Sequence, residues 1–345
     1  MNASFDVVIV GGGVTGAAVG YGLAKRGVKT CLVDAVPTFS RASRANMGLI
    51  WCQSKALGCP QFVRWGFASS RAYGKLAAEL KELSGIDTGY APTGGIIPCL
   101  GEAELEARAQ FIEKLRAETE DGTYPASVLS RKELEGMLPK VPFGPEVSGG
   151  IWSDMDGYVD PLHLMFAFRK SFVRLGGTLF AGERVSEVKP SGKGYTVVCG
   201  GRTLECGKAV LAAGLGVRKL AAQLGTDIPV FPNKSQVMLL ERIPADVLPI
   251  PLLGIARTFG GTVMIGAAHE NMGMDRRLTP EVLAANAQWA VRVWPELERK
   301  RILRFWTGLR VWPKDAYPIY DRIPGHENAF VFAMHSAVSL AAILE

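Results

Sequence analysis

Residues 7–16 read VVIVGGGVTG, and this stretch predicts the fold class. Its first four residues are apolar and β-branched, which favours a short strand buried on both faces of a parallel sheet. A G-x-G-x-x-G pattern follows at once, and a helix is expected from Val14 to about Arg26, where Gly27 ends it. A second apolar strand, Thr30–Val33, then closes at Asp34. The sequence therefore predicts an α/β domain that opens with a strand, a glycine turn, a helix and a second strand.

Each part of this unit suits the ADP half of a dinucleotide. Gly11 permits the tight turn, Gly13 lets a pyrophosphate approach the backbone, and Gly16 lets the helix lie close to the strand. The N–H groups at the start of the helix attract phosphates, and an acidic residue after the second strand accepts ribose hydroxyls and disfavours a 2′-phosphate. Either FAD or NAD fits this unit. Its predicted dinucleotide-binding residues are Gly11, Gly13, Val14, Thr15, Gly16, Asp34 and Ala35.

The composition is that of an ordinary globular protein. With 345 residues the chain can form two domains, or one large domain with a second lobe. Hydrophobic residues make up 48% and charged residues 21%, which argues against disorder. The net charge of +6 favours anionic ligands, although a solvated basic surface explains it equally well. No dense run of Lys and Arg indicates a nucleic-acid face, so no nucleic-acid partner is expected.

The cysteines and the apolar N-terminus exclude other classes of site. No two of the six cysteines are spaced as C-x-x-C, so no metal and no iron–sulfur cluster is predicted. Residues 7–24 are uncharged and nearly long enough to span a membrane, but six of them are glycine and Asp6 precedes them. This combination suits neither a signal peptide nor a spanning helix. We therefore expect a cytoplasmic protein with reduced thiols.

Beyond Asp34 the pattern is not a simple series of strand–helix–strand units. Asp160-Pro161 is a typical helix start, because the carboxylate caps the first turn and proline fits the first helical position. The predicted helices are 71–84, 102–120, 161–175 and 280–294. The predicted strands are 178–180, 184–189, 194–199, 209–212, 236–241 and 262–265.

The later segments resemble the D-amino-acid oxidase superfamily of FAD enzymes. Besides the opening unit, the resemblance rests on Ala212–Gly214, Gly308–Arg310 followed by Pro318, and His335-Ser336. Within the superfamily, residues 43–48, Gly95 with residues 102–108, and residues 266–273 resemble one branch. That branch contains glycine oxidase, the hydrogen cyanide synthase flavin subunit, and the flavin subunits of opine and D-hydroxyproline dehydrogenases.

The resemblance implies an architecture and selects FAD over NAD. It implies a Rossmann-like, GR2-type FAD-binding domain and a second, α+β substrate domain built on a mostly antiparallel sheet. The FAD-binding domain is expected from residues 1–85, 145–228 and 316–345, and the substrate domain from residues 86–144 and 229–315. The implied reaction is oxidation of the C–N bond of an amino acid or N-substituted amino acid, by hydride transfer to flavin N5.

The resemblance also assigns roles to individual residues. Arg310 is the expected anchor for the substrate carboxylate, because a planar fork fixes its orientation; an ion pair with Asp315 or Asp321 is the alternative. Arg310 and His335 are the predicted catalytic residues, and His269 joins them as a substrate contact, with a surface role equally open. The further predicted FAD contacts are Ser43, Arg44, Asn46, Met47, Gly48, Val185, Ala213, Gly214, Arg310, His335, Ser336, Ala337, Val338, Ser339 and Leu340.

Other histidines and lysines carry weaker expectations. His163 lies in an apolar helix and is expected to be a packed core residue, and His326 lies in a polar turn. Oxygen reactivity depends on a local charge near the flavin, for which Lys55 and Lys234 are candidates, so oxidase and dehydrogenase stay open. The branch often works in hetero-oligomers with a second flavin or iron–sulfur subunit, and a homo-oligomer is the alternative.

The C-terminal motif departs from the branch. The branch usually has His-Ser-Gly-Val-Thr-Leu, where this chain has His335-Ser336-Ala337-Val338-Ser339-Leu340. A positive φ at Ala337 would cost on the order of 1 kcal/mol or more. The chain then ends at Glu345, soon after the expected start of a helix. These departures leave open a subunit that binds FAD without catalysis, and an NAD-dependent dehydrogenase is a further alternative.

Overall fold

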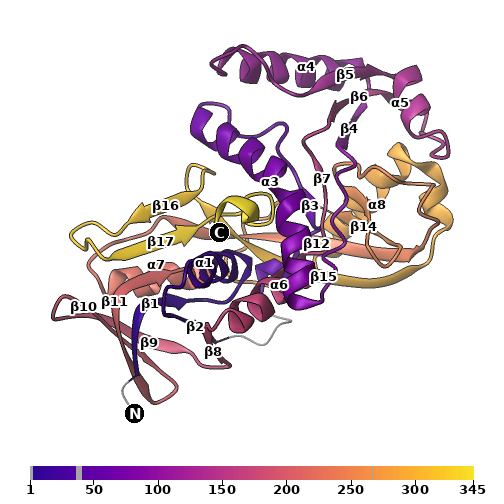
Figure 1. Cartoon of the computed structure of the whole chain (residues 1–345). Coiled ribbons are helices and arrows are strands. Elements are labelled where there is room, and N and C mark those ends of the chain that lie inside the picture. Colours follow the sequence, from indigo (N-terminus) through magenta and orange to yellow (C-terminus); the bar gives the residue numbers. More distant parts are fainter. Residues whose placement is uncertain (1–2, 36–40, 267) are drawn as a thin grey trace.

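The structure is a computed structural model that describes residues 3–35, 41–266 and 268–345. Ala267, inside the stretch 266–273 noted above, lies outside the described residues. A large mixed sheet and the helices packed on it form one part of the molecule, and smaller antiparallel sheets form the other (Figure 1).

The large sheet contains the strand–turn–helix unit that the sequence predicts. The bounds of its strands are Ala3–Val10 (β1), Thr30–Asp34 (β2), Thr178–Ala181 (β8), Val185–Ser191 (β9), Gly194–Cys199 (β10), Arg202–Leu211 (β11), Ile319–Arg322 (β16) and Ala329–Ala333 (β17). Their order is β16-β17-β11-β1-β2-β8, and β10 pairs with both β11 and β9. Strand β1 is parallel to both neighbours, and Val8 lies opposite Ala209 on β11 and Cys31 on β2. The carboxyl end of β1, where the glycine turn begins, is therefore at the centre of the sheet.

Helices cover one face of this sheet. These helices are Val14–Lys25 (α1), Pro60–Ser84 (α3) and Pro161–Arg174 (α6). The opposite face carries the short helix Val217–Ala222 (α7). The side chains of Val7 and Ile9 pack with α1, α3 and α6 in one apolar core. Val8 and Val10 point to the other face, where they pack with β9, β10 and α7. This alternation along β1 explains why the strand is apolar throughout.

The second part of the molecule is built on antiparallel strands. Its strands are Leu49–Ile50 (β3), Gly95–Leu100 (β4), Ser127–Ser130 (β5), Val147–Ser153 (β6), Gly157–Tyr158 (β7), Val230–Arg242 (β12), Ile255–Arg257 (β13), Thr262–Gly266 (β14) and Ile302–Pro313 (β15). They form sheets ordered β13-β14-β12-β15, β4-β6-β5 and β3-β7. Its α-helices are Glu102–Ala117 (α4), Arg131–Met137 (α5) and Pro280–Val293 (α8), while the short helix Ala42–Ala45 (α2) lies in the loop between β2 and β3. Short 3₁₀ helices are Gly214–Gly216, Pro295–Arg299 and Ala341–Ile343. In Figure 1, α4, α5 and β4 to β6 lie far from the large sheet, and the long strands β12 and β15 reach back toward it.

The predicted fold class is confirmed, while several element bounds differ. The helix expected at 71–84 begins at Pro60, and its first part is held by tertiary packing of Phe62 and Val63. The strands expected at 209–212 and 236–241 are parts of the longer β11 and β12, and β4 to β6 were not expected. The division into domains stays a prediction. It assigns residues 145–228 to the FAD-binding part, whereas β6 pairs with β4 and β5.

Candidate functional site

The glycine turn is shaped by close backbone approaches. Gly11 has φ +110°, and a Cβ there would lie 2.4 Å from the Ala212 carbonyl oxygen. A Cβ on Gly16 would lie 1.9 Å from the Gly11 carbonyl oxygen, so the helix can lie this close only without a side chain. A Cβ on Gly13 would meet only the Ser43 hydroxyl, at 3.0 Å. Side chains are therefore excluded from the turn by the backbone at Gly11 and Gly16, and Gly13 is the more open position.

Asp34 ends β2 in a buried position with two guanidinium groups beside it. Its Oδ2 accepts hydrogen bonds from Arg41 Nη2 at 2.7 Å and from Arg169 Nη1 at 3.2 Å. Arg41 also donates to the Gly12 carbonyl oxygen, at 3.0 Å. Burial lowers the pKa of Arg169, which the negative charge of Asp34 partly offsets. Both arginines thus bind the same carboxylate oxygen, and neither arginine was among the predicted site residues.

The loop 43–48 lies against the start of α1. Ser43 Oγ accepts a hydrogen bond from the Val14 N–H at 3.0 Å, so it occupies one N–H of the helix terminus. Asn46 closes the loop, since its side chain donates to the Ser43 carbonyl oxygen and accepts from the Gly48 N–H. Gly48 has φ +76°, and a Cβ there would lie 2.1 Å from the Val159 carbonyl oxygen. Two of the predicted contacts, Asn46 and Gly48, therefore shape this loop.

Strand β15 fixes the same loop from the other part of the molecule. The Trp306 ring N–H donates to the Ala45 carbonyl oxygen at 3.1 Å, and a Cβ on Gly308 would lie 2.4 Å from Ala45 Cβ. Gly308 is two residues from Arg310 on this strand. The loop beside the predicted ADP site is therefore in direct contact with the strand that carries the predicted substrate anchor.

Three predicted cofactor contacts lie at the edge of the large sheet. Ala213 and Gly214 follow β11 directly, and Gly214 has φ +59°. Val185 begins β9, four residues after Ala181, which lies opposite Asp34. These residues therefore surround the carboxyl ends of β1, β2 and β11, where ligands bind in open α/β sheets.

The turn 335–340 follows β17 and packs against distant elements. Ser339 Oγ accepts a hydrogen bond from the Trp51 N–H at 2.9 Å, and the Tyr73 hydroxyl donates to the Val338 carbonyl oxygen. A turn and then the 3₁₀ helix Ala341–Ile343 occupy the place of the expected helix start. Among the non-glycine residues that the structure describes, only Ser54, Ala56 and Ala316 have a positive φ. Ala337 therefore adopts its conformation without the expected backbone strain.

Arg310 has only neutral oxygen partners. Its Nη1 donates to Asn233 Oδ1 at 3.0 Å and to the Ala268 carbonyl oxygen at 2.8 Å, and its Nη2 donates to Ser235 Oγ at 2.8 Å. Asn233 lies opposite Arg310 in the β12–β15 pairing. Burial lowers the pKa of Arg310 to about 10. In residues 3–35, 41–266 and 268–345 no carboxylate pairs with Arg310, so the alternative ion pair does not form there.

Two histidines and a tryptophan connect Arg310 to the turn 335–340. The rings of His335 and Trp312 have centroids 4.4 Å apart, and the ring of His269 meets Trp312 edge-on at 5.2 Å. His269 Nδ1 is 2.9 Å from Asn233 Oδ1, which also accepts from Arg310. Burial, followed by the positive charges of Lys55 and Arg310, lowers the pKa of His335 to about 3. Burial and Arg310 lower the pKa of His269 to about 4, so both imidazoles are neutral at pH 7.

Lys55 contacts the turn 335–340 next to His335. Its Nζ donates to Ser336 Oγ at 3.2 Å, next to His335. Burial, together with the positive charge of Arg310, lowers the pKa of Lys55, although Cys52 and Asp156 oppose this. The sequence indicated Lys55 only as a candidate charge near the flavin. Its separation of 281 residues from Ser336 gave no local signal for the contact.

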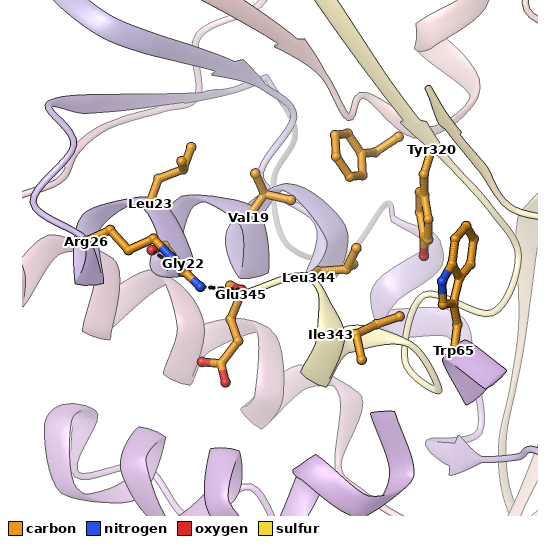
Figure 2. A pocket seen from close by; sticks show the side chains of 10 residues that line it. Val19, Gly22, Leu23, Arg26, Trp65, Tyr320, Ile343, Leu344 and Glu345 are labelled. Carbon is orange, nitrogen blue, oxygen red and sulfur yellow. Dashed lines mark hydrogen bonds between the residues drawn. The ribbon is translucent and has the colours of Figure 1, made fainter. Parts of the chain in front are cut away.

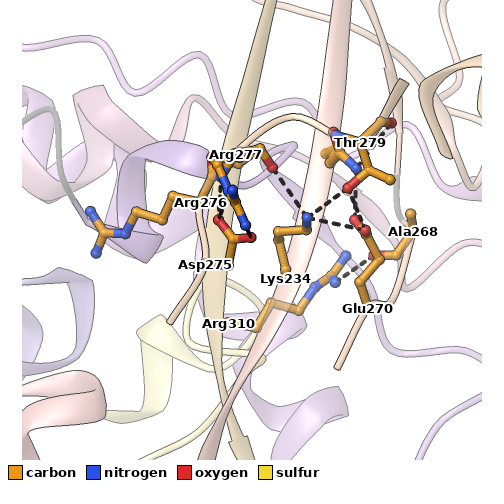
Figure 3. A network of polar contacts seen from close by, with 10 residues as sticks. Lys234, Ala268, Glu270, Asp275, Arg276, Arg277, Thr279 and Arg310 are labelled. Atoms are coloured by element: carbon orange, nitrogen blue, oxygen red, sulfur yellow. Dashed lines mark hydrogen bonds and ion pairs between the residues drawn. The ribbon is translucent and has the colours of Figure 1, made fainter. Parts of the chain in front are cut away.

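Lys234 belongs to a different network (Figure 3). It is buried, forms an ion pair with Glu270 at 3.1 Å, and donates to Thr279 Oγ1 at 2.7 Å. Because successive side chains on a strand point to opposite faces, Lys234 lies on the face of β12 away from Asn233 and Ser235. Its charge is therefore compensated, and it connects the segment after β14 to the sheet.

A cavity of about 470 Å³ lies elsewhere, between α1, α3, β16 and the residues around Leu344 (Figure 2). Its lining is mostly apolar, with Val19, Leu23 and Trp65 among its side chains, and it contains none of the predicted site residues. We therefore separate it from the candidate site. No helix in residues 3–35, 41–266 and 268–345 combines the length and the apolar character of a membrane span.

The residues present fit an FAD molecule. At the ADP end, the glycines leave the backbone accessible at the start of α1, and Asp34 is held at the end of β2. At the other end, His335 Nδ1 is buried and has no hydrogen-bond partner within the described residues. A buried polar atom without a partner is costly, and a ligand offsets this cost when it supplies one.

Comparison with known proteins identifies the family. Residues 6–344 match the family described as "FAD dependent oxidoreductase", abbreviated DAO. The chain belongs to the DAO family of FAD-dependent oxidoreductases. It is therefore an oxidoreductase that uses FAD, and the alternative of an NAD-dependent dehydrogenase is set aside.

Several relatives of the DAO family align along nearly the whole chain. An opine oxidase subunit of Agrobacterium tumefaciens (strain Ach5) is 35% identical, over 98% of this chain and 90% of the relative. Hydrogen cyanide synthase subunit HcnC of Pseudomonas aeruginosa is 28% identical, over 95% of this chain and 88% of the relative. The crystal structure of glycine oxidase from Geobacillus kaustophilus is 26% identical, with a TM-score of 0.90 over 99% of this chain and 93% of that one. The resemblance inferred from the motifs is thus confirmed.

Two expectations about histidines have different outcomes. The prediction of a core His163 is wrong, because the ring is only half-buried, lies 2.9 Å from the Asp87 carbonyl oxygen and meets Phe259 edge-on. It lies on a side of α6 that faces a loop rather than the sheet. His326 lies in a turn as expected, between the Tyr195 hydroxyl and the Leu224 carbonyl oxygen.

Proposed function

We propose that this DAO-family protein oxidises the C–N bond of an α-amino acid or N-substituted amino acid. The observation that carries the proposal is Arg310, a half-buried guanidinium whose partners are three neutral oxygens. A buried cation without a counter-charge is costly, and a substrate carboxylate offsets that cost by forming a bidentate pair. The relatives named as opine oxidase and glycine oxidase support a substrate with an amine next to a carboxylate.

The groups around Arg310 fix the orientation of its guanidinium plane, which the proposed binding of a carboxylate requires. Asn233 and Ser235 come from β12 and the Ala268 carbonyl from the segment after β14, so three neighbours restrict the guanidinium. FAD, when bound there, would supply the hydride acceptor for oxidation of the substrate carbon next to the amine, and Arg310 would orient that carbon by holding the carboxylate. The protein contributes position and electrostatics, because a neutral amine needs no strong protein base.

The predicted catalytic residue His335 acts as a neutral group in this proposal. Its low pKa, with burial as the main cause, excludes a charged imidazolium at pH 7. Its Nδ1 can form a hydrogen bond with the flavin or the substrate, and the Trp312 ring that packs against it restricts its orientation. His269 fixes Asn233, and through it Arg310, so we propose it as a positioning residue.

FAD is proposed to lie along one continuous set of residues. The glycine turn and Asp34 hold the ADP half, the loop 43–48 and Ala213-Gly214 border the pyrophosphate and ring, and the turn 335–340 borders the flavin. These are the residues that the sequence and the family resemblance indicate, and their contact with FAD stays a proposal.

Anaerobic titration of the purified protein tests the activity. Glycine, sarcosine, D-proline derivatives and opines are added in turn, and loss of the oxidised-flavin absorbance is followed. A suitable substrate bleaches the flavin in proportion to the amount added. Flavin that stays oxidised with every amine and opine would contradict the proposal.

A second candidate function is an FAD-binding subunit that transfers electrons or serves a structural role. It is favoured by two relatives that are named as subunits, one of opine oxidase and one of hydrogen cyanide synthase. On this proposal the chain works in a hetero-oligomer. Bound flavin that no amine reduces, but that reduced partner protein does reduce, would favour this function over the first.

A further inference from the structure

The turn that carries Lys55 has an unusual backbone. Ser54 and Ala56, which flank it, have φ values of 56° and 68°. Residues with a side chain rarely adopt this left-handed conformation, and it costs on the order of 1 kcal/mol or more at each position. Such strain persists only where the surroundings enforce it, and it gathers at functional sites. The conformation of this turn therefore indicates that the direction of Lys55 matters.

Asp156 holds the start of this turn in place through hydrogen bonds. Its Oδ1 accepts hydrogen bonds from the backbone N–H groups of Cys52 and Gln53, and its Oδ2 accepts from Gln53 Nε2 at 2.7 Å. Gln53 Nε2 also donates to the Gly95 carbonyl oxygen. Asp156 and Gln53 are both buried. Asp156 therefore accepts hydrogen bonds from residues of the turn and forms no ion pair with Lys55.

Lys55 and Arg310 are two cations without a carboxylate partner. Within the described residues neither takes part in an ion pair, and the lysine Nζ has a neutral partner, Ser336 Oγ, at 3.2 Å. The lysine is half-buried, and burial lowers its pKa as it lowers that of Arg310. Two desolvated cations in one region are stabilised by a ligand that carries two negative charges.

One chain of contacts joins the two cations. Lys55 contacts Ser336, and the ring of the neighbouring His335 packs at a tilt against Trp312. Trp312 meets His269, and His269 shares Asn233 Oδ1 with Arg310. Lys55 and Arg310 are therefore linked through this series of side chains, and they are close enough for the charge of Arg310 to lower the pKa of Lys55.

We propose that Lys55 binds a second substrate carboxylate, so that the substrate class is a secondary amine flanked by two carboxylates, an N-(carboxyalkyl) amino acid. The inference rests on the proposed function, since Arg310 is taken to bind the first carboxylate. It distinguishes this class from simple amino acids such as glycine and sarcosine, which have one carboxylate.

The test compares two substrates that differ in one charge. N-(carboxymethyl)glycine carries two carboxylates, and N-(carbamoylmethyl)glycine replaces one of them with a neutral amide of the same size. The ratio of the rate constant of flavin reduction to Kd is measured for each by anaerobic flavin reduction in the unmodified protein. We expect the dicarboxylate to be favoured about 30-fold or more, as for other buried charge pairs.

Three variants test whether the preference for the dicarboxylate depends on Lys55. Lys55→Met keeps the length of the side chain and removes the charge, and we expect it to reduce the preference to within a few-fold of one. Lys55→Arg keeps the charge, and it should retain most of the preference. Lys132→Met, an exposed position on α5, is the matched control and should not change the ratio. Flavin content and thermal melting establish that each variant folds.

The outcomes separate the two proposals. If the unmodified protein oxidises the amide as well as the dicarboxylate, or if Lys55→Met lowers both rates by the same factor, the second carboxylate site is wrong and the proposed function stands. If no amine or opine reduces the flavin, the proposed function fails and the inference fails with it.

Discussion

Gly16 and Gly20 lie one turn apart on α1 and meet different surroundings. A Cβ on Gly16 would lie 1.9 Å from the Gly11 carbonyl oxygen, while a Cβ on Gly20 would meet Ile9 and Phe172 at 3.4 Å, an ordinary contact. We expect Gly16→Ala to destabilise the fold by about 1–3 kcal/mol and to reduce FAD retention, because the backbone at Gly11 must move to make room for the new methyl group.

Gly20→Ala is the matched control for this prediction. It should stabilise the helix by up to about 1 kcal/mol, since alanine is the better helix former. Denaturation midpoints and flavin content are measured for both variants. Equal effects of the two substitutions would contradict the packing argument.

Arg310 permits a second prediction at the residue scale. Arg310→Leu should lower kcat/KM for carboxylate substrates by about 30-fold or more, because the substrate carboxylate loses its partner. The effect should fall mainly on KM, and the flavin spectrum should change little. Arg310→Lys should recover only part of the activity, since an ammonium group lacks the planar fork. Steady-state kinetics of the two variants give the answer, and unchanged kinetics in Arg310→Leu would reject the role.

Among the elements, the turn 51–56 depends on one carboxyl group. Burial raises the pKa of Asp156 from 3.8 to about 7, although hydrogen bonds from Cys52 and Gln53 oppose this. The folded protein therefore holds a proton that the unfolded chain has released between these pH values. The contribution of Asp156 to stability is fully present below about pH 4 and is lost as the pH rises through about 7.

A pH series with Asp156→Asn tests this assignment. The neutral histidines His335 and His269 act in the opposite direction, because their pKa values are lowered and their contribution is lost as the pH falls below 6.5. We therefore predict the difference in free energy of unfolding between the unmodified protein and Asp156→Asn. This difference should fall by a few kcal/mol between pH 4 and 7. A constant difference would show that Asp156 keeps an ordinary pKa.

For the molecule as a whole, FAD binding should stabilise the fold. The proposed site joins segments from both ends of the chain, so bound cofactor restrains all of them. Free FAD at about 100 times its Kd should add about 2.7 kcal/mol to the free energy of unfolding. Thermal melting of the cofactor-depleted protein is measured against FAD concentration, with ADP and riboflavin as controls that each fill part of the site. A Tm independent of FAD would contradict the proposed site.

The sequence predicted those parts of the molecule whose signals are local. The unit from β1 to β2 was predicted because apolar runs, glycine spacing and an acid lie within about thirty residues. Helix α6 was predicted for the same reason, since Asp160 caps it by accepting from the Leu162 and His163 N–H groups. Family resemblance then supplied the later segments, and the family match confirmed it.

Features that depend on tertiary contacts were not predicted. Arg169 reaches Asp34 from 135 residues away, and Lys55 reaches Ser336 across 281 residues. The register of β12 against β15 decides that Asn233 lies opposite Arg310, and no local pattern encodes that register. Asp156 looks like an ordinary loop carboxylate in the sequence. Its pKa follows from burial that only the folded chain provides.

If the turn 335–340 borders the flavin as proposed, the pairing of β17 with β11 sets the time at which the protein can bind its cofactor during synthesis. Asp34 leaves the ribosome early, but β17 and the turn 335–340 follow roughly 300 residues later. At about 5–20 residues per second, this delay is roughly 15–60 s. During that time the glycine turn exists without the flavin end of its site. On the proposed site, a nascent chain retains FAD only after the turn 335–340 has been released, and chains truncated before this turn should emerge as apoprotein.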